Sequence, residues 1–255
     1  AFNNLPEMVA SVAEAFGDTL VFQDFHPGGQ FLQAHADDAS VQAAIQQGGW
    51  DYIVMQEQSQ IPTIPFFRQD LFMPGSADLR QQRDQHAPCA RLLYFLTWGR
   101  ENGGQQCNSG FCSVNFTNFV HYQDTLTWAY QRAADQNGAG IAPVGETWRA
   151  AQQAHDASLP ALNLFASDGS HPSLQGSYLA ALSIYSAVFR RPVDRPSAFN
   201  PGLDSSLAAF FRSVVDSTVW PRRTEWRLRD TSSAITRLGW AASATSWSWG
   251  HSLTS

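Results

Sequence analysis

The chain has 255 residues, a length that suits one large domain or two small ones. Hydrophobic residues make up 44% of it, aromatic residues 13% and charged residues only 15%, which excludes a disordered or low-complexity polymer. All 16 basic residues are arginine, and the formal net charge is −6. Because such a chain has no overall positive field and no apolar run of about 20 residues, we expect neither nucleic acid nor a membrane as a partner.

The first third of the chain shows apolar spacings typical of alternating helices and strands. Residues 5–16 have helical spacing with Pro6 in the first turn, and residues 19–25 are a β-branched and aromatic run. A polar helical pattern covers about 30–47. Residues 51–55 are apolar at consecutive positions, as in a strand whose sheet is covered on both faces.

The same alternation continues after a long irregular stretch. Residues 62–87 are rich in Pro, Phe, Gln and Arg, and we expect them to form a loop or a short helix over the strand ends. Further strands are predicted at 91–98 and 141–144, and further helices at 117–136, 148–156, 173–189 and 203–219. Strands that alternate with helices predict an α/β fold, a three-layer sandwich around a doubly wound parallel sheet, in one domain covering 1–255.

Three cysteines are too few for a disulfide framework. Cys107 and Cys112 are separated by four residues, and a disulfide bridge could close this short loop. Cys89 would then be the odd cysteine. A zinc site needs more ligands than this spacing offers. A bridge would imply an oxidising compartment, so we expect a secreted or periplasmic protein.

An Asp and a His stand three residues apart in a predicted loop. Asp168 and His171 lie between an apolar stretch and a predicted helix. A carboxylate that accepts from one imidazole nitrogen fixes the tautomer and leaves the other nitrogen to take a proton from a nucleophile. Taken alone, the same pattern also fits an ordinary turn with an Asp cap.

Several segments together resemble the SGNH (GDSL-like) hydrolase superfamily. Residues 168–181 read DGSHPSLQGSYLAA, residues 50–59 WDYIVMQEQS, residues 94–98 YFLTW and residues 143–148 PVGETW. The first resembles the last motif block of that superfamily, and the others resemble its strands and strand ends. The resemblance implies a flavodoxin-like, five-stranded doubly wound sheet and an ester hydrolase that needs neither a metal nor an organic cofactor.

The nucleophile block of that family, Gly-x-Ser-Leu at the end of the first strand, is found near the C-terminus instead. Gly250-His251-Ser252-Leu253 follows a β-prone aromatic run at 245–249. The resemblance therefore implies a circular permutation in which 193–244 is the connecting segment, 245–249 is the central strand and the two chain ends meet beside the site. The alternative is a chance tetrapeptide in a frayed tail.

The resemblance also implies an oxyanion hole. Its donors would be the backbone amides of Ser252 and Gly29 and a side-chain amide after the third strand of the family. Gln58 aligns with the family's Asn, and Gln56 is the second choice. Without the resemblance, both glutamines and the Gly28-Gly29 turn are ordinary polar connections.

The resulting interpretation is a serine esterase for small acyl groups, with acetyl esters of carbohydrate as the favoured substrates. Ser252 is the nucleophile, His171 the general base and then acid, and Asp168 orients His171. Trp98, Trp148 and the 66–67 Phe pair could stack on sugar rings, although packing in the core explains them more readily. The oligomeric state cannot be predicted.

Two rival functions use the same residues differently. One is a carbohydrate-binding protein on the same scaffold without turnover, in which Ser252 is misplaced. The other is a phosphodiesterase in which His171 and Asp168 hold a metal ion.

Overall fold

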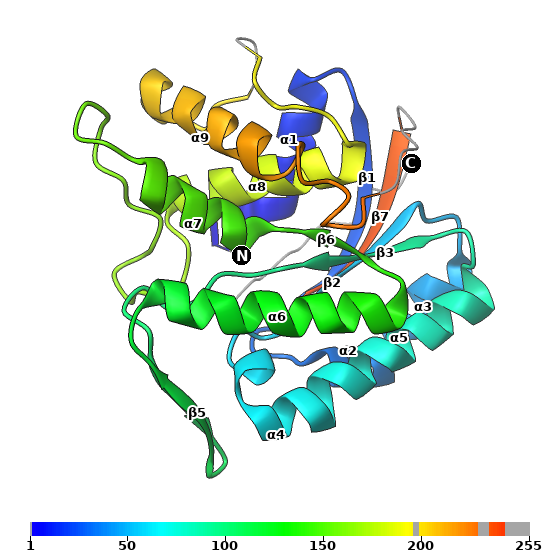
Figure 1. Ribbon diagram of the computed structural model, residues 1–255. Helices are drawn as coiled ribbons and strands as arrows, with labels where there is room; N and C mark the ends of the chain where they lie inside the picture. The colour runs from blue at the N-terminus through cyan, green and yellow to red at the C-terminus, as the bar shows by residue number, and fades with distance from the viewer. Residues whose placement is uncertain (1, 196–198, 229–234, 243–255) are drawn as a thin grey trace.

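Five parallel strands form the centre of the fold. In the computed structural model, residues 2–195, 199–228 and 235–242 are described, and the sheet order is β1-β7-β2-β3-β6 (Figure 1). The strands are β1 (Thr19–Phe25), β7 (Ile235–Ala242), β2 (Tyr52–Gln56), β3 (Arg91–Phe95) and β6 (Gly140–Ala142). The prediction of an α/β fold with a parallel sheet is confirmed.

Helices cover both faces of this sheet (Figure 1). On one face lie α1 (Leu5–Ala15) and α8 (Leu174–Phe189), followed by α7 (Val144–Ala154) and α9 (Ser205–Thr218). On the other lie α2 (Leu32–Asp37), α3 (Ala39–Gln47), α5 (Met73–His86) and α6 (Phe119–Asn137). All five residues of β2 are buried, as its continuous apolar run predicts.

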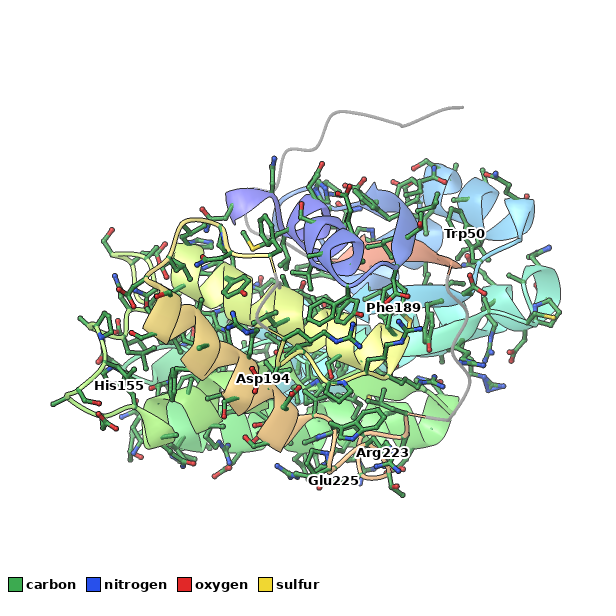
Figure 2. The ribbon with its side chains drawn as sticks, turned by 90° about the horizontal axis from the view of Figure 1, so that it is seen from above. Trp50, His155, Phe189, Asp194, Arg223 and Glu225 are labelled. Atoms are coloured by element: carbon green, nitrogen blue, oxygen red, sulfur yellow. A yellow bond between two sulfur atoms is a disulfide. The ribbon has the colours of Figure 1, made fainter. Side chains whose placement is uncertain are left out.

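Helix α8 is the most deeply buried of the helices. It contains no charged residue, and every residue from Gly176 to Phe189 is buried. A helix that is apolar all round needs cover on its outer side as well. Helix α9 supplies that cover, and Figure 2, which looks down on this face, shows it beside α8. No helix in the described ranges is long and apolar enough to cross a membrane.

Two segments give more detail than their predictions. The expected helix at 30–47 is interrupted at Asp38, whose side chain accepts from the N–H groups of Ser40 and Val41 and so caps α3. Segment 62–87, expected to be a loop or a short helix, is largely helical and continues from η2 (Ile61–Thr63) through α4 (Pro65–Phe67) and η3 (Arg68–Phe72) into α5. Its polar composition reflects α5, which buries few residues, among them Leu79, and leaves the rest at the surface.

A small hairpin was missed by the sequence analysis. Strands β4 (Gly104–Asn108) and β5 (Phe111–Phe116) pair antiparallel and project from the body of the molecule (Figure 1). Cys107 and Cys112 are opposite each other in this pair and form a disulfide, with 4.1 Å between their Cα atoms. The predicted bridge is therefore confirmed, and Cys89 is exposed and outside it.

Strand β7 holds an interior position of the sheet, between β1 and β2, with Ile235 opposite Thr19 of β1 and Leu238 opposite Tyr52 of β2. Segment 193–244, expected to be a connection that leads to a central strand at 245–249, thus itself contains an interior strand. The sequence favours the aromatic run because it directly precedes Gly250-His251-Ser252-Leu253, whereas the glycine at the middle of β7, Gly239, weakens the strand pattern there. Residues 245–249 themselves are outside the described ranges.

Candidate active site

The loop before α8 holds the predicted Asp–His pair. Asp168 Oδ1 accepts from the backbone N–H of Ser170 at 2.9 Å and of His171 at 2.8 Å, while its Oδ2 contacts Nδ1 of His171. Gly169 has a φ of +65°, a left-handed conformation that makes this tight return possible. The structure therefore brings Asp168 and His171 into direct contact.

This contact determines the charge of Asp168 and the tautomer of His171. Partial burial acts to raise the pKa of Asp168, but the hydrogen bonds from the amide and ring of His171 and from the Ser170 amide outweigh it and lower the pKa to about 2. The carboxylate is thus ionised at neutral pH. It accepts from Nδ1–H of His171, which makes Nε2 the nitrogen suited to take a proton from a nucleophile.

The segment that follows β3 holds this loop against the sheet. The indole Nε1 of Trp98 donates to the Ser170 carbonyl at 2.9 Å, and the Glu101 amide donates to the Gly169 carbonyl at 2.9 Å. Trp98 stacks on Trp148 at 4.2 Å between ring centroids. Both indoles are buried, so they support the loop from the core and do not form a sugar-stacking surface. The Asp168–His171 pair consequently lies at the edge where the parallel strands end.

The end of β2 carries Gln56 and the buried Glu57. Gln56 pairs with Ala242 of β7 in the sheet, and its buried Oε1 has no hydrogen-bond partner among the described residues. Oε1 of Glu57 accepts from the backbone N–H of Gln58 at 2.7 Å. The backbone nitrogen of Leu32 lies 3.3–3.4 Å from the two carboxyl oxygens of Glu57. Burial raises the pKa of Glu57 to about 8, against the lowering effect of these amides. This acid was not identified from the sequence.

Gln58 lies in the loop after β2, and hydrogen bonds hold its side-chain amide in one orientation. Its Oε1 accepts from the N–H groups of Gln60 at 2.7 Å and Ile61 at 3.3 Å, and its Nε2 donates to Gln60 Oε1 at 3.1 Å. Gln60 Nε2 in turn donates to Gln106 Oε1 of the disulfide hairpin at 3.0 Å. A primary amide has two N–H groups, so this arrangement uses one donor of Gln58 and fixes the direction of the other.

The end of β1 carries Gly29 and an Asp–His pair that the sequence analysis missed. Gly29 is exposed with a φ of +72°. Nε2 of His26 contacts Oδ2 of Asp24, and His26 is buried. The signal in the sequence was the Asp-x-His spacing at a strand end, where side chains two residues apart point to the same face. A second imidazole–carboxylate pair thus lies at the end of β1, at the same edge of the sheet.

The structure collects most of the predicted site at this one edge. Gly29 follows β1, Gln56 ends β2 and Gln58 follows it, and the His171 loop is tied to the segment after β3. Ser252 lies outside the described residues. Asn3 Nδ2 donates to Ser177 Oγ in the first turn of α8 at 3.0 Å, so the N-terminal segment runs close to the His171 loop. Ala1 and Ser255, expected to be neighbours, are also outside the described residues. Within the described part of the chain, no group of three or more His, Cys, Asp or Glu side chains could hold a metal ion.

Comparison with solved structures identifies the fold. A crystal structure of a DUF4886 family protein from Bacteroides uniformis superposes with a TM-score of 0.67 and 18% identity, covering 88% of this chain and 90% of that one. A protein from Slackia heliotrinireducens described as "a putative SGNH hydrolase" superposes with a TM-score of 0.54 and 26% identity, covering 72% and 90%. The fold is SGNH-like. Comparisons of the sequence with family models and with curated proteins find no match.

Proposed function

We propose that the protein is a serine esterase that hydrolyses small acyl esters, with acetyl esters of carbohydrate as the favoured substrates. The observation that carries this proposal is the contact between Asp168 and His171 at the C-terminal edge of the sheet in an SGNH-like fold. An ionised carboxylate that orients a solvent-accessible imidazole is the acid–base half of a hydrolytic triad.

In the proposed mechanism, Ser252 attacks the ester carbonyl carbon while Nε2 of His171 takes the hydroxyl proton. The negative charge that develops on the carbonyl oxygen is stabilised by the amides of Ser252 and Gly29 and by the side chain of Gln58. His171 then returns the proton to the leaving alcohol, and an acyl group remains on Ser252. Water, deprotonated by His171, releases the carboxylic acid and restores the serine.

The position of β7 supports the proposed circular permutation. This strand comes from the C-terminal part of the chain, yet it lies between β1 and β2 and runs parallel to both. It therefore ends at the edge that carries Gln56 and the His171 loop. Ser252 is ten residues beyond Ala242, and an extended segment of that length spans up to about 33 Å. A segment of this length is long enough for Ser252 to return to the edge that carries His171. The rival serine is Ser243, which follows β7 directly.

Exposed aromatic side chains of α4 and of the disulfide hairpin support a carbohydrate substrate. The rings of Phe66 and Phe111 stack at 3.8 Å between centroids, and Phe67 meets both edge-on. Phe66 and Phe111 are each 41% exposed. Flat apolar rings at a surface suit the apolar faces of sugars. The disulfide that closes this hairpin supports a secreted or periplasmic location.

Hydrolysis of a chromogenic acetyl ester tests the proposal. The full-length protein should hydrolyse the ester, Ser252→Ala should lose activity by several orders of magnitude, and Ser243→Ala should retain it. Full activity in the presence of a chelator is expected, and loss of activity there would favour the metal phosphodiesterase. Absence of turnover would favour the carbohydrate-binding protein. Loss in Ser243→Ala alone would remove Ser252 from the mechanism.

A further inference from the structure

Two arginines lie over an exposed tryptophan of α6. A surface cavity of about 410 Å³ is lined by residues of η3, of the start of α5 and of α6, among them Arg68, Met73, Trp128 and Arg132. The guanidinium carbons of Arg68 and Arg132 are 4.7 and 5.3 Å from the centroid of the Trp128 ring. Trp128 is 46% exposed, so solvent reaches this group of side chains. We call Arg68, Trp128 and Arg132 the Arg–Trp–Arg cluster.

The two charges of this cluster have no acidic partner within the described residues. Arg68 Nη1 donates to the Pro62 carbonyl at 3.0 Å, and the other interactions of the two arginines are with the Trp128 ring. Burial and the neighbouring charge of Arg132 lower the pKa of Arg68, as expected for two cations held together without an acid. Asp70, the one acid of η3, is exposed and does not line the cavity.

The acids of the two helices beside the cluster already have partners. On α6, Asp124 pairs with Arg149 at 2.6 Å, and Asp135 pairs with Arg227. The two aspartates of α5 also accept from side chains outside the cluster. An incoming anion therefore does not have to displace an acid from the Arg–Trp–Arg cluster.

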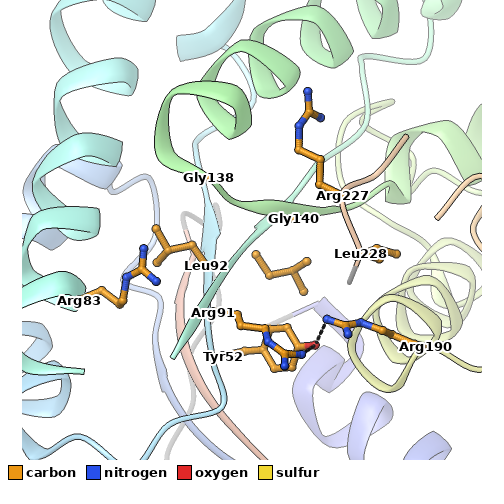
Figure 3. Close-up of a pocket in the computed structure, with 10 residues that line it drawn as sticks. Tyr52, Arg83, Arg91, Leu92, Gly138, Gly140, Arg190, Arg227 and Leu228 are labelled. Carbon is orange, nitrogen blue, oxygen red and sulfur yellow. Dashed lines mark hydrogen bonds between the residues drawn. The ribbon is translucent and has the colours of Figure 1, made fainter. Parts of the chain in front are cut away.

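A smaller cavity, of about 110 Å³ and also lined by arginines, lies at the edge of the sheet where the strands begin (Figure 3). There the Tyr52 hydroxyl accepts from Arg190 Nη2 at 2.7 Å and from Arg91 Nη1 at 3.2 Å. Arg83 and Arg227 in the same lining form ion pairs with aspartates. These arginines have partners within the protein and serve the fold, whereas the charge of the Arg–Trp–Arg cluster is left uncompensated among the described residues.

The stacking on the indole leaves guanidinium donors available to a ligand. A guanidinium over an aromatic ring interacts through its face, while its five N–H groups lie in its plane. Within the described part of the chain, Arg68 uses one nitrogen, at the Pro62 carbonyl, and Arg132 uses none. A carboxylate has two oxygens that accept in parallel from such a fork. The cluster therefore offers donors for a carboxylate beside an apolar ring.

Exposed aromatic rings continue from the cluster toward the catalytic edge. Phe66 of α4 is two residues before Arg68 and stacks on Phe111 of the disulfide hairpin at 3.8 Å between centroids. The hairpin is in turn bonded to the loop after β2, where Gln60 Nε2 donates to Gln106 Oε1 at 3.0 Å. Flat apolar rings next to a carboxylate-binding group suit a sugar that bears a carboxylate.

We propose that the Arg–Trp–Arg cluster binds the carboxylate-bearing sugars of an acidic polysaccharide, the polymer that carries the ester. This inference rests on the proposed function in taking the ester to be one of carbohydrate. The formal net charge of −6 repels a polyanion at long range, so such a polymer binds where a local cluster of unpaired cations overcomes that repulsion. A neutral polysaccharide offers the sugar rings but no group for the two guanidinium ions.

Affinity electrophoresis of the full-length protein in gels with and without polygalacturonate, at low and constant ionic strength, tests this proposal. Retardation by the polymer is expected, and Arg132→Gln should weaken binding about tenfold, the usual effect of losing a hydrogen bond between charged groups. Trp128→Ala removes the ring that both guanidinium groups contact and should weaken binding about twofold to fivefold. Arg80→Gln is the matched control, because it changes the net charge equally and pairs with Asp84 but does not line the cavity.

Four outcomes would overturn the proposal. They are the absence of retardation, equal affinity in the wild type and Arg132→Gln, equal retardation by neutral dextran, and competition by polyglutamate or dextran sulfate as strong as by polygalacturonate. The last would indicate a surface for acidic peptides or for polyanions in general. Because binding is measured without turnover, esterase activity without this binding contradicts the inference alone. Binding that is sensitive to Arg132→Gln without any esterase activity supports the cluster and contradicts the proposed esterase.

Discussion

The two edges of the central sheet carry opposite chemistries. At the C-terminal edge lie carboxylate–imidazole pairs, Asp168 with His171 and Asp24 with His26, together with the protonatable Glu57. At the N-terminal edge, Arg91 and Arg190 meet at the hydroxyl of a tyrosine. The comparison teaches that the formal net charge of −6 says little about any one site. Groups that exchange protons gather at one edge, and groups whose charge is fixed gather at the other.

The largest expected effect separates the two edges by activity. His171→Ala and Ser252→Ala should each lower kcat by about 10⁴- to 10⁶-fold, and the double variant should be little worse because triad members act as one unit. Arg91→Gln, at the opposite edge of the sheet, should keep its esterase activity. Steady-state kinetics on these variants measure this. Full additivity of the two losses would contradict the triad.

A smaller effect is expected for the oxyanion donor. Gln58→Ala should lower kcat by about 10²- to 10³-fold, since loss of one donor typically has that cost. Gln56→Ala should have less effect on kcat. Thermal unfolding of both variants provides the control for folding. If Gln56→Ala has the larger loss, Gln56 is the donor and the alignment of Gln58 with the family's Asn is wrong.

The disulfide should contribute stability at the catalytic edge. Cys107→Ser combined with Cys112→Ser should lower the free energy of unfolding by about 2 to 3 kcal/mol in the chain-entropy model, because so short a loop restricts the unfolded chain only moderately. Denaturant unfolding measures this, with Cys89→Ser as the matched control. Alkylation of the unreduced protein should modify one thiol, and three modified thiols would refute the bridge.

The smallest effect, measured per pH unit, concerns the pH dependence of stability. The pKa of Glu57 is raised from 4.5 to about 8, so between these values the folded protein binds more protons than the unfolded chain. Its free energy of unfolding should therefore fall as pH rises through this window, by at most about 1.4 kcal/mol per pH unit. Glu57→Gln, which imitates the protonated acid, should flatten the slope in urea titrations from pH 5 to 8. An unchanged slope would contradict the raised pKa.

The sequence predicted the parts of the fold that depend on local pattern. The apolar run of β2 and the charge-free helix α8 show their burial directly, and Asp168 and His171 are close enough in sequence for one loop to join them. The interior strand β7 could not be predicted in this way, because it contains Gly239 and is identified only by its neighbours on both sides.

The two arginines at Tyr52 show a second limit of sequence analysis. Arg91 and Arg190 are about 100 residues apart and meet only because β3 begins beside Tyr52 while α8 ends there. No spacing in the sequence connects them. The hydrogen bonds between Gln58 and Gln60 could not be predicted either, because a glutamine-rich strand end does not show which amides bond to one another.

Covalent trapping of the nucleophile tests the central claim most directly. A fluorophosphonate reacts with an activated serine, displaces fluoride and leaves a stable phosphonyl ester on the oxygen. Peptide mass spectrometry of the labelled wild-type protein should place that mass on Ser252, and labelling should disappear in His171→Ala because the base is lost. Labelling of a different serine, or esterase activity with no labelling at all, would contradict the account.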